Sequence, residues 1–238
     1  MICDHVTRGA RVFTWVGGAT FVTSLAICAY HYLIVWARPL PPAVASEIPV
    51  IAIAADLLLL TAFALHHSAF AREPVKEAVA RFVPEHLVRS VYVWAASLLL
   101  IAVCVWWQPI GGDVYDDSVG GRAYGHALIQ LLGLWITARG VARIDPLELA
   151  GIRPAAQSQG LQVTGPYHWV RHPLYLGWLL MVFGAAHMTR DRLLFATITT
   201  LYLVVAIPWE ERSLRRSFDG EYARYMRDVK WRMIPFIY

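Results

Sequence analysis

The sequence is poor in charge. Only 16% of its 238 residues are charged, whereas 58% are hydrophobic. Soluble domains carry about 25% charged and roughly 45 to 50% apolar residues. A soluble domain could not cover this much apolar side chain with polar surface, so the excess is expected to face lipid. The composition argues against an ordinary soluble domain and favours an integral membrane protein.

Cysteine is also scarce. The three cysteines stand at positions 3, 28 and 104 without a C-x-x-C spacing, which argues against a disulfide framework and against a thiolate metal site. Nine histidines are present, but only His66 and His67 cluster, and the H-x-x-H-H repeats of diiron membrane enzymes are missing. No metal is therefore expected.

Long apolar runs predict the membrane spans, because a helix needs about 20 mostly apolar residues to cross a bilayer. The four direct candidates run from Phe13 to Trp36, Ile48 to Phe70, Leu87 to Trp107 and Tyr124 to Arg143. A fifth run, Leu174 to Trp209, is too long for one span and contains a polar tetrad at residues 189–192, so it predicts a helical hairpin. The first run lacks a clear small-residue cleavage site and is expected to be retained. The predicted fold is an all-α, polytopic bundle of about six transmembrane helices.

Lysine and arginine predict the orientation, because they collect on the cytoplasmic side of a membrane. Of the 21 basic residues, seventeen fall in alternate connecting segments that include both ends of the chain, and four fall in the others. Both termini are therefore expected in the cytoplasm, in a bacterial inner membrane. The net charge of +4 is expected to meet anionic lipid headgroups rather than nucleic acid.

Two regions are predicted along the chain. Residues 1–144 would form a four-span bundle, and residues 145–238 would form one unit of loop, hairpin and cytosolic C-terminal helix. The polar loop from Asp145 to Pro173 is long enough to suggest function. The C-terminal helix has one apolar face, and Asp219-Gly220 is expected to divide it into two short helices. The face consists of Leu214, Phe218, Tyr222, Tyr225 and Val229.

Charged groups are predicted to converge at the cytosolic end of the hairpin. Arg171 and His172 precede Pro173, a good first residue for a helix, and the free N–H groups of a helix N-terminus attract anions. Glu210 and Glu211 end the second hairpin helix at the same depth. Adjacent helix residues point about 100° apart, so one glutamate could pair with Arg171 and the other could bind a ligand amine or hydroxyl. Gly177 would allow another helix or a flat ligand to approach.

These motifs resemble the isoprenylcysteine carboxyl methyltransferase and phospholipid methyltransferase superfamily. The matching elements are G-P-Y-x-W-x-R-H-P-x-Y-x-G at 165–177, the hairpin, Glu210-Glu211, and G-E-Y-x-x-Y at 220–225. Upstream, residues 65–72, 82–84, 89–92 and 107–109 are similar to the bacterial methanethiol S-methyltransferase branch, which also covers nitric-oxide-reduction-associated membrane proteins. Residues 145–151 depart from the short hydrophobic-aromatic loop of that branch, which leaves the substrate open.

The resemblance implies S-adenosyl-L-methionine as methyl donor, bound at the cytosolic end of the hairpin and covered by the C-terminal helix. Cationic groups would bind its carboxylate, a glutamate its amino or hydroxyl groups, and tyrosines its adenine and sulfonium. The residues predicted to bind it are Tyr167, His172, Tyr175, Gly177, Glu210, Glu211, Tyr222 and Tyr225.

Three residues are predicted to act on the acceptor: Arg171, Glu210 and His67. Arg171 could stabilise a thiolate or a carboxylate, or it could simply pair with a glutamate or a lipid headgroup. His67 could accept a proton, or it could be a hydrogen-bonded surface group. Asp56, an acid near the middle of a span, is a functional candidate by position.

The acceptor is expected to be either a small thiol or a lipophilic one such as an isoprenylcysteine, whose carboxylate would be methylated. Three tryptophans near the site, at 169, 178 and 209, favour a small pocket. Two other classes stay open: an NADPH-dependent, sterol-type membrane reductase, and a non-catalytic membrane factor for the maturation of respiratory enzymes.

Overall fold

A computed structural model describes residues 7–38, 50–70, 72–142, 145–153 and 160–238. Cys3 and two predicted span limits, Ile48 and Arg143, lie outside these residues. The chain is mostly helical, so the all-α prediction is confirmed at that level. Its elements gather into two compact units that alternate along the sequence. The prediction divided the chain at residue 144 and assigned everything before it to one bundle. In the structure, residues 109–144 group instead with the C-terminal elements.

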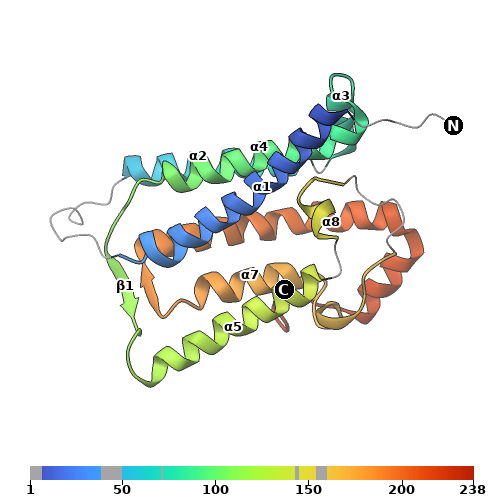
Figure 1. The fold of residues 1–238 in the computed structure, drawn as a ribbon. Coiled ribbons are helices and arrows are strands. Elements are labelled where there is room, and N and C mark those ends of the chain that lie inside the picture. Colours follow the sequence, from blue (N-terminus) through green and yellow to red (C-terminus); the bar gives the residue numbers. More distant parts are fainter. Residues whose placement is uncertain (1–6, 39–49, 71, 143–144, 154–159) are drawn as a thin grey trace. The chain divides into compact units, whose positions relative to one another are not determined.

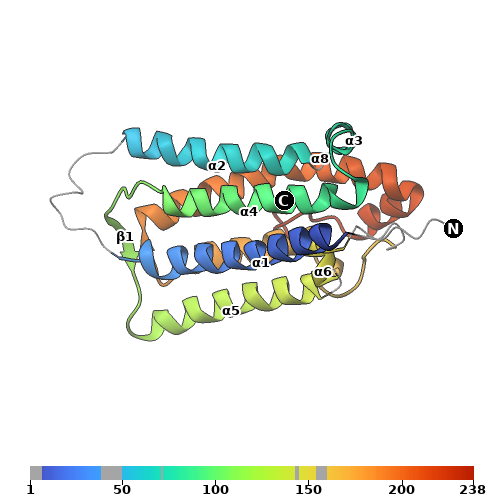
Figure 2. The ribbon, with the colours of Figure 1, turned by 45° about the horizontal axis from the view of Figure 1, so that its top comes forward.

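The first unit is built on three long helices, α1 (Arg8–Tyr30), α2 (Val50–Phe70) and α4 (Glu85–Val105). Helix α4 contacts both α1 and α2, and the three run side by side in both ribbon views (Figures 1 and 2). At Gly17, α1 lies so close to Trp94 that an added Cβ would be 2.7 Å from the indole nitrogen. The unit is completed by η1 (His31–Val35), α3 (Glu73–Ala80) and α6 (Pro146–Leu149).

The second unit contains the helices of the predicted hairpin. Its elements are β1 (Asp113–Asp116), α5 (Gly121–Val141), η2 (Gly165–His168), α7 (Pro173–Phe183), β2 (His187–Thr189) and α8 (Arg190–Asp228). Strands β1 and β2 pair antiparallel, with Asp113 opposite Thr189 and Asp116 opposite His187. No strand was predicted there, because strands of three and four residues are too short to show an alternating pattern.

Glycines allow α5 and α7 to pack closely within the second unit. A Cβ at Gly177 would lie 2.8 Å from the carbonyl oxygen of Gly133 and would overlap Thr137. Gly140 faces Leu174 in the same contact. Small residues let helix backbones approach in this way. This packing positions the first turns of α7. Val170, just before α7, and Leu176, within it, are buried against Ile136 of α5.

Helix α8 is one continuous helix of 39 residues. The predicted break at Asp219-Gly220 is therefore wrong. Pro208 lies inside the helix, where it cannot donate a backbone hydrogen bond. The last turns of α8, red in Figure 1, turn away from the axis of its first part. They carry Tyr222 and Tyr225, which together with Val229 just after the helix pack on Leu161 and Val163. These contacts outweigh the low helix propensity of Asp-Gly.

Four helical segments in the described part of the chain are long and apolar enough to cross a membrane. They are Arg8–Val35, Val50–Phe70, Glu85–Val105 and Arg190–Phe218. Helix α5 is 21 residues long but does not belong to this apolar group, and α7 has only 11 residues. The chain is thus a helical membrane protein, and the count of six spans with a membrane-crossing hairpin stays a prediction.

Candidate active site

The segment that leads into α7 takes its shape from glycine and proline. Gly165 opens η2 with a φ of +66°, a backbone conformation that favours glycine. Pro166 lies in the first turn of η2, and Pro173 begins α7. The missing N–H of proline costs nothing at such a position. Between these two turns, Arg171 and His172 are held at the N-terminus of α7.

The chain after α8 straps Arg171 and His172 in place. The backbone N–H of Arg171 donates to the carbonyl of Trp231 at 2.9 Å, and that of His172 donates to Arg232 at 2.8 Å. The Arg171 side chain also donates to the carbonyls of Val229 and Lys230, at 2.8 and 2.9 Å. We call residues 229–232 the strap. The motif before α7 is thus completed by residues about sixty positions further along the chain.

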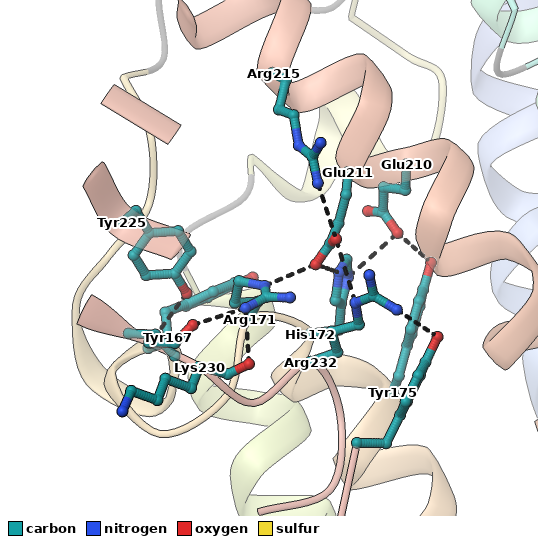
Figure 3. A network of polar contacts seen from close by, with 12 residues as sticks. Tyr167, Arg171, His172, Tyr175, Glu210, Glu211, Arg215, Tyr225, Lys230 and Arg232 are labelled. Atoms are coloured by element: carbon teal, nitrogen blue, oxygen red, sulfur yellow. Dashed lines mark hydrogen bonds and ion pairs between the residues drawn. The ribbon is translucent and has the colours of Figure 1, made fainter. Parts of the chain in front are cut away.

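Glu211 lies buried at the centre of a cluster of basic groups (Figure 3). Its side chain is 1% exposed and accepts a hydrogen bond from Arg171 Nε at 2.7 Å. His172 Nε2 lies 3.5 Å from the carboxylate, Arg232 Nε 3.4 Å, and Arg215 3.9 Å. Glu211 is therefore the glutamate that pairs with Arg171, an assignment that the sequence left open.

Glu210 points to a different surface of the same helix. Its side chain is 44% exposed and accepts a hydrogen bond from the Tyr175 hydroxyl at 2.8 Å. His172 Nδ1 lies 3.4 Å from the same carboxylate oxygen, and the rings of His172 and Tyr175 are stacked (Figure 3). The imidazole of His172 thus stands between two carboxylates, one exposed and one buried.

A pocket of about 230 Å³ opens beside these groups. Six of the eight residues predicted to bind the donor line it, together with Arg171. These are Tyr167, His172, Tyr175, Glu210, Tyr222 and Tyr225. The rest of the lining consists of Leu161, Gln162, Pro173, Leu174, Leu214 and Phe218. Leu214 and Phe218 belong to the predicted apolar face, whereas no motif pointed to Leu161 or Gln162.

Three tyrosines, Tyr167, Tyr222 and Tyr225, line the pocket together with the charged groups. The Tyr225 hydroxyl donates to the carbonyl of Tyr167 at 2.7 Å. The Tyr222 hydroxyl is buried and has no hydrogen-bond partner in the described part of the chain. Burial, followed by neighbouring negative charge, raises the pKa of all three hydroxyls. They stay protonated at neutral pH and can donate hydrogen bonds.

The two glutamates keep His172 basic. Burial by itself lowers the pKa of His172, but the carboxylates of Glu210 and Glu211, 3.4 and 3.5 Å away, outweigh it, and the pKa is raised. A cationic His172 beside Arg171 suits an anionic ligand group. Glu210 suits an amine or a hydroxyl on the same ligand.

Two predicted donor-binding residues do not line the pocket. Gly177 is buried in the contact between α7 and α5, where its lack of a side chain serves helix packing. Glu211 lies among the basic groups described above. The motifs predict that His172→Ala and Glu211→Ala would each weaken donor binding at least tenfold with the fold intact. Because Glu211 forms buried ion pairs, we expect its replacement to cost stability as well.

His67 and Asp56 belong to the first unit. His67 Nδ1 lies 2.6 Å from the Tyr92 hydroxyl, and Asp56 is buried and accepts a hydrogen bond from the backbone N–H of Gln108 at 2.8 Å. Both residues thus make structural hydrogen bonds within that unit. A catalytic role for His67 as a proton acceptor stays a prediction. The charged pocket, by contrast, is formed within the second unit alone.

The fold and the pocket define a helical membrane protein whose pocket combines cationic groups, one accessible carboxylate and several tyrosines. No group of three or more His, Cys, Asp or Glu side chains within the described ranges could hold a metal ion. Such a pocket suits a small ligand that carries both an anionic and a cationic or hydroxyl group.

Sequence comparisons place the chain among known membrane methyltransferases. Residues 123–221 match the family described as "Phospholipid methyltransferase". The methanethiol S-methyltransferase of Crocosphaera subtropica is 34% identical over 241 residues, covering 96% of this chain and 94% of that protein. Methanethiol S-methyltransferase 2 of Bradyrhizobium diazoefficiens is 37% identical, with 75% and 71% covered. Nurim of Danio rerio is 29% identical, with 91% and 83% covered. No solved structure matches.

The chain therefore belongs to the phospholipid and isoprenylcysteine carboxyl methyltransferase superfamily, as its motifs indicated. Membership supports methyltransferase activity in a membrane protein. The matched region, residues 123–221, includes all but the first two residues of α5, together with α7, the motif before α7 and both glutamates.

Proposed function

We propose that this chain is an S-adenosyl-L-methionine-dependent methyltransferase that methylates a small thiol. One observation carries the proposal: a single pocket contains Arg171, His172 and Glu210 beside a wall of tyrosines. The names of the relatives support a thiol such as methanethiol as acceptor. A lipophilic acceptor, methylated at a thiol or a carboxylate, is the broader alternative.

The residues of the pocket fit this donor. Its methionine carboxylate needs cations or N–H groups, which Arg171, His172 and the N-terminus of α7 offer. Its amino or ribose hydroxyl groups need an acceptor, which Glu210 offers. Tyr222 has a buried hydroxyl without a partner among the described residues, which is a hydrogen bond left for a ligand. Leu214, Phe218 and the tyrosines offer surfaces for adenine.

The size of the pocket limits how much of the donor it encloses. Pockets that bury drug-sized ligands usually measure roughly 300 to 1,000 Å³, and this one measures about 230 Å³. Part of a ligand as large as S-adenosyl-L-methionine would therefore remain outside the enclosed space. This suits a transferable methyl group that must be reached by an acceptor.

The protein residues would mainly bind, orient and exclude water. S-adenosyl-L-methionine supplies an electrophilic methyl group on a sulfonium. His172 and Arg171 would fix the carboxylate end of the donor, and Glu210, oriented by Tyr175, would fix its amino or hydroxyl groups. Alignment of this kind lowers the barrier of a bimolecular displacement by several kcal/mol, roughly 7 to 11 in well-oriented cases. Arg171 already pairs with Glu211, so its charge on the acceptor side is partly neutralised.

Calorimetric titration of the purified protein in detergent tests the proposal. We expect saturable binding of S-adenosyl-L-methionine and none of NADPH, followed by methyl transfer to methanethiol in a coupled assay. Binding of NADPH alone would favour a sterol-type reductase. Donor binding without transfer to any thiol or prenylcysteine would favour a non-catalytic membrane factor.

We further propose that the chain lies in a bacterial inner membrane with both termini in the cytoplasm, as the basic residues indicate. Anionic lipid headgroups would then be its partners on that side. Reporter fusions at residue 238 and in the segment 117–120 would test the topology. Cytoplasmic activity of the second fusion would contradict it.

A further inference from the structure

Glu211 differs from the other charged groups of the site in its surroundings. It does not line the pocket, and its side chain is 1% exposed. Its carboxylate contacts Arg171 at 2.7 Å, Arg232 at 3.4 Å and Arg215 at 3.9 Å. An ionised carboxylate can be buried this deeply only when basic groups compensate for the lost water. Glu211 is therefore held as an anion behind the pocket wall.

His172 connects this buried anion to the pocket. Its Nε2 faces Glu211 at 3.5 Å, and its Nδ1 faces Glu210 at 3.4 Å. Tyr175, on α7, stacks on the imidazole ring. The backbone N–H of His172 donates a hydrogen bond to the carbonyl of Arg232 in the strap. Arg171 is the neighbouring cation in the chain. Arg171 also lines the pocket but keeps its charge at every pH of interest, so the imidazole is the titratable group through which the charge of Glu211 can affect a bound ligand.

We propose that Glu211 is a positioning residue, which does not touch the methyl donor and acts on it through His172, by holding the imidazole as a cation against the pocket. This inference rests on the proposed function, since the donor carboxylate is the anion that a cationic His172 would bind. It assigns different parts to the two adjacent glutamates. Glu210 contacts the ligand, and Glu211 sets the pH range in which the ligand binds.

The raised pKa of His172 supports this assignment, because the two nearby carboxylates oppose the effect of burial. Removing the charge of Glu211 should lower that pKa. A fall of one pKa unit reduces the protonated fraction about tenfold at pH values above both pKa values. The donor should then bind normally at low pH and more weakly at high pH.

Two variants change the charge around His172 in opposite directions. Glu211→Gln removes the buried negative charge and keeps the shape of the side chain. Arg232→Gln removes a positive charge that lies 3.4 Å from Glu211 and outside the pocket lining. Asp228→Asn, an exposed carboxylate on the same helix, is the matched control. A merely structural role for Glu211 would not give opposite shifts in the first two variants.

The first measurement needs no donor. We would follow the His172 ring signal by NMR in protein with ¹³C-labelled histidine, from pH 5 to pH 9, with His172→Gln to assign it. We expect the midpoint of the His172 titration to fall by about one pH unit in Glu211→Gln. It should rise in Arg232→Gln and stay unchanged in Asp228→Asn. An unchanged midpoint in Glu211→Gln overturns the proposal. If that variant does not fold, a midpoint that fails to rise in Arg232→Gln overturns it.

The second measurement is the Kd for S-adenosyl-L-methionine at pH 6 and pH 8.5. We expect Glu211→Gln to match the parent protein at pH 6 and to bind about tenfold more weakly at pH 8.5. Equal weakening at both pH values would mean that Glu211 contacts the donor directly, and would overturn the proposal. Absence of donor binding in the parent protein, with the NMR shifts as expected, would instead contradict the proposed function.

Discussion

Arg171 donates from Nε to Glu211 at 2.7 Å, and the two side chains are 6% and 1% exposed. This ion pair joins the N-terminus of α7 to α8. Removing one partner of a buried ion pair is costly, because the other charge then stays buried without compensation. The stability of the site and its ability to bind a ligand are therefore linked through one contact.

Replacing Glu211 by alanine should destabilise the protein. We expect a loss of about 3 to 5 kcal/mol, the usual cost of breaking a buried pair by removing one partner. Thermal unfolding in detergent measures the effect. Glu210→Ala is the control, since Glu210 is half exposed and its loss should cost about 1 kcal/mol or less. Equal melting temperatures for the two variants would contradict the central position of Glu211.

Replacing Glu210 should affect ligand binding rather than stability. In Glu210→Gln the side chain that faces the pocket loses its charge. We expect S-adenosyl-L-methionine to bind about tenfold more weakly, because one charge-assisted hydrogen bond is lost. Tyr175→Phe removes the hydroxyl that orients Glu210 at 2.8 Å and should weaken binding by less. Calorimetry checks both. An unchanged Kd in Glu210→Gln would remove Glu210 from the donor site.

The titration of His172 should make stability depend on pH. Its pKa is raised in the folded protein, so the folded state binds the proton more tightly than the unfolded chain does. The resulting stabilisation is complete below the unfolded pKa, about 6.5, and is lost as pH rises through the folded pKa. Between pH 6 and pH 9 the melting temperature of the parent protein should therefore fall more than that of His172→Gln. Parallel curves would contradict this.

Replacing Gly177 by alanine should weaken the packing of α5 on α7. The new Cβ would overlap Thr137 and lie 2.8 Å from the Gly133 carbonyl, so a backbone has to move. We expect a loss of about 1 to 3 kcal/mol, typical of overpacking. Gly220→Ala is the matched control, because a Cβ there meets nothing within 4 Å and alanine favours the helix by roughly 1 kcal/mol. Thermal unfolding should move in opposite directions in the two variants.

The sequence predicted the charged half of the site because its signals are local. Arg171 and His172 precede a proline that begins a helix, and Glu210-Glu211 end an apolar run, so both pairs could be placed at one level. Arg215 was not predicted, although it follows Glu211 by four residues, a spacing that indicates an ion pair on a helix. The pattern of residues does not distinguish the two glutamates. That choice depends on which side of α8 faces Arg232, and this is set by tertiary packing.

The strap escaped prediction because it acts through backbone carbonyls. The carbonyls of Val229, Lys230, Trp231 and Arg232 accept hydrogen bonds from Arg171 and His172, and every residue type carries such a carbonyl. The continuity of α8 across Asp219-Gly220 was missed for a different reason. Local propensity favours a break there, but the apolar contacts of Tyr222 and Tyr225 with the segment around Leu161 hold the helix together.

The strap also sets an order of events during protein synthesis. Arg171 donates to Val229, which follows it by 58 residues. When Arg171 leaves the ribosome, none of the carbonyls that will hold its side chain has yet been made. Helix α8 must be translated and inserted first, and only then can residues 229–232 close over the motif before α7. The motif before α7 therefore stays without its backbone partners until the residues after α8 have been made.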